Sequence, residues 1–64
     1  MPKESELEEA ARIVIKKHGS AAVWAAELRA QNLSKDGQAG AAAIWRRIAE
    51  VIRRIQADGT DPSA

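Results

Sequence analysis

Four arginines in the second half of the sequence are the residues best suited to bind another molecule. They form two adjacent pairs, Arg46-Arg47 and Arg53-Arg54. A guanidinium group offers forked N–H donors that match the oxygens of a phosphate or a carboxylate. A separation of seven residues places both pairs on the same side of a helix. The sequence therefore predicts a candidate anion-binding face made of Arg46, Arg47, Arg53 and Arg54.

An alternative interpretation of this face is that it is simply solvated and paired with itself. Glu50 lies four residues after Arg46, three before Arg53 and four before Arg54, so it can form an ion pair along the helix with any of them. The net charge is only +1, from ten basic and nine acidic residues. This balance predicts no strong nonspecific attraction to nucleic acid. We favour the solvated face and keep nucleic-acid or anion binding as the alternative function.

A helix-turn-helix motif for DNA is a further possibility, because a tight turn at Gly19 would join the first two predicted helices. The second helix would then read the bases. Its first two turns, residues 21–28, contain no Arg, Lys, Asn or Gln to contact base edges, and Glu27 would repel phosphate. The sequence therefore argues against sequence-specific DNA binding.

Catalytic and metal-binding constellations lack most of their parts. His18 is the single histidine and the chain has no cysteine, so we interpret His18 as a cap residue that complements the dipole at a helix carboxyl end. An acidic cluster at the start favours a helix amino end rather than a metal. The serines fall at predicted caps, loops or the tail. The acidic cluster consists of Glu4, Glu6, Glu8 and Glu9, and the serines are Ser5, Ser20, Ser34 and Ser63. We predict no enzyme, no metal, no cofactor and no small-molecule substrate.

The first helix is predicted at residues 6–17. Ser5 and Glu8 have the spacing of a capping box, in which a hydroxyl and a carboxylate each accept from a free backbone N–H. Apolar residues then recur every three or four positions up to Ile15. Basic residues close the helix, and Gly19 can adopt the left-handed conformation that ends it.

The second helix is predicted at residues 21–32, with Ser20 as its N-cap. It is apolar around most of its circumference, yet a helix in a three-helix bundle contacts only two neighbours. Either the side with Val23, Ala26 and Ala30 or the side with Trp24 and Leu28 should therefore stay exposed, and exposed apolar patches mark interfaces. The candidate partner interface comprises Val23, Trp24, Ala26, Leu28 and Ala30.

Residues 32–37 carry the one internal loop signal, including the dipeptide Asp36-Gly37. A third helix follows at residues 38–57 and is the most clearly amphipathic segment, with isoleucines and Trp45 on one arc and arginines on the other. We expect Trp24 and Trp45 to anchor the core. An interface role for one of them is the alternative, because tryptophan is common at binding hot spots.

Length and composition limit the chain to one domain. A chain of 64 residues buries only about 60% of its unfolded surface, and without cysteine it cannot be stabilised by disulfides. We expect an extension at residues 1–5, a domain at 6–57 and a disordered tail at 58–64. No apolar run approaches the roughly 20 residues that span a bilayer, and no export signal opens the sequence. The cytoplasm is the expected compartment.

Several short motifs carry a resemblance to a known family. They are Lys17-His18-Gly19, Ala26-Glu27 and Trp45-Arg46-Arg47-Ile48-Ala49. In these motifs residues 8–56 resemble a family of short alphaproteobacterial helical proteins known only as a domain of unknown function. The chain departs from that family around Gly37-Gln38 and Gly40, where the family has a Gly-Asp pair and a glycine just before the tryptophan turn. The resemblance implies a compact helical fold and no known activity.

These observations predict an all-α fold, a small three-helix bundle with a flexible C-terminal tail. The leading functional hypothesis is a non-enzymatic protein–protein interaction module that forms a homodimer. A core built largely from alanine is thin, and a second copy would enlarge it.

Overall fold

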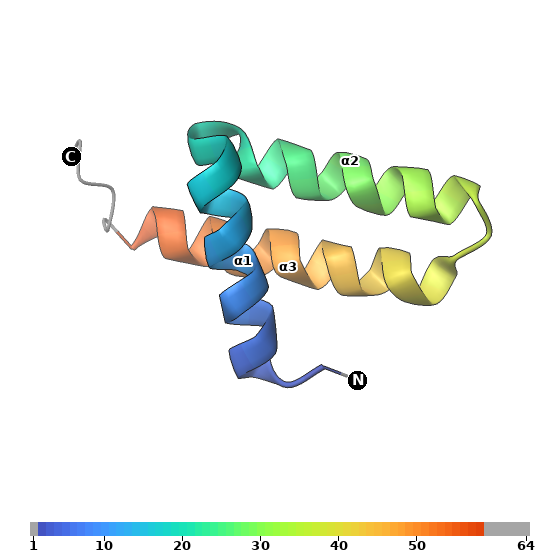
Figure 1. The fold of residues 1–64 in the computed structure, drawn as a ribbon, viewed down its shortest axis with the longest axis horizontal. Coiled ribbons are helices and arrows are strands. Elements are labelled where there is room, and N and C mark those ends of the chain that lie inside the picture. Colours follow the sequence, from blue (N-terminus) through green and yellow to red (C-terminus); the bar gives the residue numbers. More distant parts are fainter. Residues whose placement is uncertain (1, 59–64) are drawn as a thin grey trace.

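A computed structural model describes residues 2–58, which are almost entirely helical and contain no strand. The elements are α1 (Glu4–His18), a short 3-10 turn η1 (Gly19–Ala21), α2 (Ala22–Lys35) and α3 (Ala39–Ala57). Figure 1 shows α2 and α3 side by side as an antiparallel hairpin, with α1 crossing α3 at a steep angle. The predicted all-α fold is confirmed.

The join between α1 and α2 is a bend rather than a loop. Helical structure runs without interruption from Glu4 to Lys35, and η1 turns its direction sharply. Gly19 makes the bend possible, since its backbone has φ 57° and ψ −125°, a conformation that favours glycine. Its N–H still donates to the carbonyl of Ile15, and the N–H of Ala22 donates to the carbonyl of Gly19. The prediction of two helices separated at this glycine is therefore replaced by one bent helical segment.

Two predicted N-caps are wrong. The N-cap of α1 is Lys3, whose backbone N–H donates to the Glu6 carboxylate at 3.0 Å, so Ser5 lies inside the first turn. Lys3 can be the N-cap because the Glu6 carboxylate accepts from the backbone N–H of the N-cap residue, and every residue except proline has that N–H. Because α1 begins at Glu4, the last two residues of the predicted extension at 1–5 belong to the helix. Ser20 lies within η1, and α2 has no side-chain cap hydrogen bond.

The second helix ends three residues later than predicted. The turn-forming residues Asn32 and Ser34 are helical, and the chain reverses only over residues 36–38. The N–H of Gln38 donates to the carbonyl of Leu33 at 2.9 Å, and that of Gly37 to Ser34 at 3.1 Å. With Gly37 at φ 80°, this is a Schellman motif. The Asp36-Gly37 signal thus marks the stop correctly, but the polar residues before it do not.

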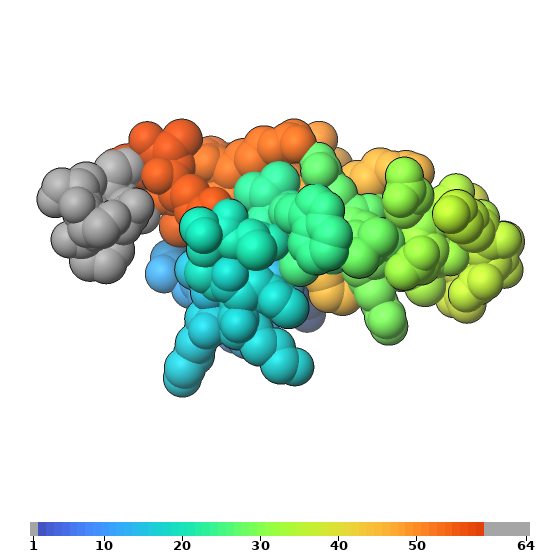
Figure 2. All heavy atoms as spheres, turned by 90° about the horizontal axis from the view of Figure 1, so that it is seen from above, coloured from blue at the N-terminus to red at the C-terminus, as the bar shows by residue number. Residues whose placement is uncertain are grey.

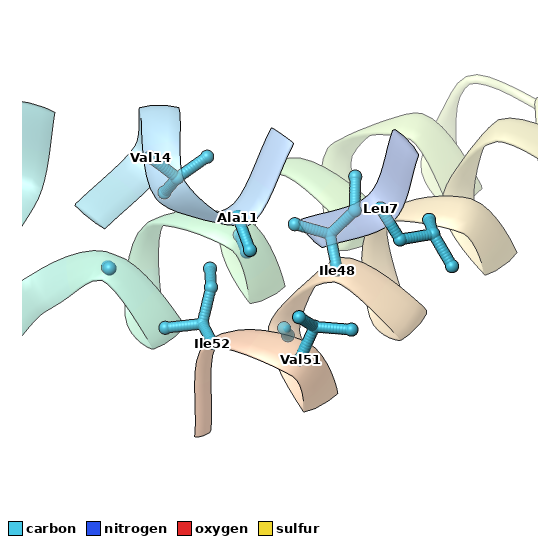
Figure 3. Packing of buried hydrophobic residues seen from close by; sticks show 9 residues of the cluster. Leu7, Ala11, Val14, Ile48, Val51 and Ile52 are labelled. Carbon is cyan, nitrogen blue, oxygen red and sulfur yellow. The ribbon is translucent and has the colours of Figure 1, made fainter. Parts of the chain in front are cut away.

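The core lies where α1 crosses the hairpin. Figure 3 shows the buried side chains of α1 lying over those of α3. Among the described residues, Ile52 is the one large side chain that is fully buried. Six of the eleven buried apolar residues are alanine. The buried set is Leu7, Ala11, Val14, Ala22, Ala26, Ala30, Ala42, Ile48, Ala49, Val51 and Ile52.

The space-filling view from above shows α2 extending along the hairpin with its outer side uncovered (Figure 2). The described chain is elongated, because α1 covers only part of the hairpin (Figure 1). The tail predicted at 58–64 lies outside the described residues except for Asp58, which follows the end of α3.

Candidate functional site

The outer face of α2 carries the most exposed large apolar side chain of the described residues. Trp24 is 65% exposed and Leu28, one helical turn later, is 39% exposed. With Glu27 and Gln31 they line a shallow depression of about 200 Å³. These residues share one side of α2 because positions three and four apart are neighbours on a helix. We call Trp24, Leu28 and Gln31 the α2 stripe.

The structure divides the predicted partner interface into two opposite sides of α2. Trp24 and Leu28 are exposed, whereas Ala26 and Ala30 are buried at 0% and 2%. Val23 is half-buried and packs against the core. The alanines are already covered within one chain, so they cannot contact a partner directly. Of the two sides that the sequence left open, it is the Trp24 side that stays uncovered.

The two tryptophans have different environments. Trp45 is half-buried and packs against the core, as predicted. The guanidinium carbon of Arg29 lies 6.0 Å from the centre of its ring, which is within the range of a cation–π contact. Trp24 does not anchor the core, because it lies on α2 opposite the alanines that pack inward.

The arginine face of α3 is partly occupied by the other helices. Arg53 forms an ion pair with Glu27 of α2, and Arg54 forms one with Glu4 of α1 at 3.2 Å. These adjacent arginines therefore pair with different helices and link α3 to both neighbours. All four side chains are well exposed to solvent, so each pair contributes about 1 kcal/mol or less to stability.

The proposed self-pairing through Glu50 is not seen. Within residues 2–58 the ion pairs of Arg53 and Arg54 are made with other helices, and Glu50 takes part in none. Arg46 and Arg47 likewise form no ion pair with a described residue. They line different hollows: Arg46 lines a depression with Glu27 and Gln31, and Arg47 lines a groove beside α1. Two of the four predicted anion-binding arginines are thus engaged in ion pairs, and the other two line different hollows.

That groove was not predicted from the sequence. It lies between the start of α1 and the first half of α3, and its volume is about 450 Å³. Leu7, Ala43 and Ile44 contribute apolar surface, with Glu4 and Arg47 as its charged residues. Leu7 and Ile44 are 37 positions apart in the sequence, so no local pattern brings them together; only the crossing of α1 over α3 does.

The remaining sequence predictions concern a metal site, His18 and a membrane-spanning helix. No group of three or more His, Cys, Asp or Glu in the described part of the chain could hold a metal ion. His18 stands in the last turn of α1 with Lys16 and Lys17, where a positive charge complements the helix dipole. No helix between residues 2 and 58 is long and apolar enough to cross a membrane.

Comparison of the chain with protein-family models, with curated proteins and with solved structures found no match.

Proposed function

We propose that the protein is a non-enzymatic interaction module that pairs with a second copy of itself through the α2 stripe. The observation that carries this proposal is the exposure of Trp24, at 65%. An exposed indole with an exposed leucine one turn away is the kind of surface that concentrates binding energy.

The charge of the stripe favours a second copy as the partner. Trp24, Leu28 and Gln31 are all uncharged, and the nearest carboxylate, Glu27, is paired with Arg53. Two copies of this surface can therefore approach each other without repulsion between like charges. A two-fold axis near Leu28 would set the indole of each copy beside the Gln31 end of the other.

The thin core adds a thermodynamic reason. Most of the buried residues are alanine, so the apolar area that one chain removes from water is small. Burying Trp24 and Leu28 against a partner would add to it. An interface made by one helix from each copy is small, and we expect micromolar affinity.

The test is the mass of the protein in solution. We expect light scattering to show dimers at high micromolar concentration, and Trp24→Gln to shift the protein to monomer without loss of helix. Ile13→Gln is the matched control, because Ile13 is 62% exposed on the outer side of α1 and should leave the mass unchanged. A wild-type protein that stays monomeric, with a melt independent of concentration, would refute self-association.

Anion or nucleic-acid binding through α3 is the alternative proposal. It is supported by Arg46 and Arg47, which have no ion pair with a described residue. It is the weaker proposal because the other two arginines are engaged by Glu4 and Glu27.

The proposal assumes that α1, α2 and α3 act together as a small three-helix bundle, which the contacts of all three in one core support. A cytoplasmic location and membership of the alphaproteobacterial family remain predictions from the sequence.

A further inference from the structure

The groove between α1 and α3 combines an apolar lining with one unbalanced charge. Leu7 is buried at its inner side, while Ile44 is 36% exposed. Pro2, Gly40 and Ala43 complete the apolar lining. Apart from its chain neighbours and the backbone of its own helix, Gly40 has no atom of a described residue within 4 Å of the place where a side chain would begin, so the backbone of α3 is open to the groove there.

The charges at the groove are not equivalent. The Glu4 carboxylate accepts from Arg54 at 3.2 Å and is already balanced. Arg47 forms no ion pair with any described residue. A ligand in the groove would therefore meet apolar carbon along its length and a single free guanidinium at one edge.

We propose that this groove binds a single molecule of a medium-chain aliphatic carboxylate. The alkyl chain would lie against Leu7, Ala43 and Ile44, and the carboxylate would accept hydrogen bonds from the Arg47 guanidinium. A volume of about 450 Å³ falls within the usual range of small-molecule sites, which are mainly apolar with a few orienting polar groups. A carboxylate matches the planar donor fork of arginine.

This site is independent of the proposed self-association. The groove is built from α1 and α3, whereas the α2 stripe lies on the outer side of α2. Failure of one proposal therefore leaves the other standing, and the ligand can be tested in the Trp24→Gln protein.

Calorimetric titration with decanoate, kept below its micelle concentration, tests the proposal. We expect Arg47→Gln to raise the dissociation constant about threefold to tenfold, as for one partly exposed charge-assisted contact. Arg46→Gln is the matched control, since Arg46 is also exposed and forms no ion pair with a described residue, but lies outside the groove. Its dissociation constant should stay within about twofold of the wild type.

Two further measurements make the result specific. Decanol has the same chain without the charge and should bind equally to the wild type and to Arg47→Gln. Ile44→Gln, which removes apolar surface, should weaken both decanoate and decanol. The proposal is overturned if decanoate does not bind below millimolar concentration, if the two arginine variants lose affinity equally, or if Ile44→Gln has no effect.

Discussion

The two sides of α3 pack by different means. On one side, the buried residues of α2 are all alanines spaced four residues apart along one face of the helix: Ala22, Ala26 and Ala30. On the other side α1 buries Leu7 and Val14 as well as Ala11, and Figure 3 shows these residues above Ile48, Val51 and Ile52. One contact depends on small side chains, the other on large ones.

Small and large contacts fail in opposite ways. A row of alanines lets two helices approach closely, so a larger side chain at one of these positions must force the helices apart. A layer of large side chains fills space between helices at a wider separation, so a shortened side chain leaves a cavity. The two interfaces of this protein can therefore be told apart by the kind of substitution that damages each.

The largest effect is expected at the layer beneath α1. Ile52→Ala removes the one large side chain that is fully buried among the described residues, and we expect a loss of about 2 to 5 kcal/mol in the free energy of unfolding. Urea denaturation followed by circular dichroism measures it. Ile13→Ala makes the same change at a position 62% exposed and should cost about 0.5 kcal/mol or less. Equal losses at the two positions would contradict the assignment of this core.

A smaller effect is expected at the alanine contact. Ala26→Leu adds three carbon atoms at a position with no exposed surface, and we expect a loss of about 1 to 3 kcal/mol in the free energy of unfolding. Ala43→Leu makes the same change at an exposed position of α3 and should be nearly neutral, because alanine and leucine both favour helices. If Ala26→Leu were neutral or stabilising, α2 and α3 could not be in close contact at this point.

The smallest effect is expected at the bend that holds both interfaces in place. Gly19→Ala puts a side chain on a backbone at φ 57°, which we expect to cost about 1 to 2 kcal/mol. Beyond the two chain neighbours, no atom of a described residue lies within 4 Å of the added carbon, so the cost comes from the backbone conformation and not from a clash with the surroundings. Gly40→Ala, in α3 and equally free of neighbours, should instead stabilise by about 0.5 to 1 kcal/mol. Thermal melts of both variants would show whether their shifts have opposite signs.

The sequence was a good guide to features set by neighbouring residues. The apolar helical patterns, the change of direction at Gly19 and the turn at Asp36-Gly37 are all local, and the structure has all of them. The first two patterns form one bent segment, however, and Gly19 has ψ −125° rather than the left-handed conformation. The cap at Ser5 and the loop at 32–35 were wrong, although they are local too. Ser5, Asn32 and Ser34 have only a moderate preference for helix ends. Glu6 instead accepts from the N–H of Lys3 at the start of α1, and α2 continues through Asn32 and Ser34.

Features that depend on how helices meet were predicted less well. The sequence shows that α2 is apolar on several sides but not which side faces α3, so Ala26 and Trp24 were placed in one interface. The pairing of Arg53 and Arg54 with Glu27 and Glu4 was missed because intrahelical spacing points to Glu50. The groove at Leu7 and Ile44 depends on the crossing angle of α1, which no periodicity encodes.

The hairpin of α2 and α3 also bears on the order in which the chain can fold. Its helices are joined by three residues, so their contacts close short loops and lose little chain entropy. The Arg54–Glu4 pair, by contrast, joins positions fifty residues apart. We expect the hairpin to form first and α1 to dock onto it, guided by the bend at Gly19. In the native state the reverse step would release α1 before the hairpin opens, briefly exposing Ile48 and Ile52 to solvent.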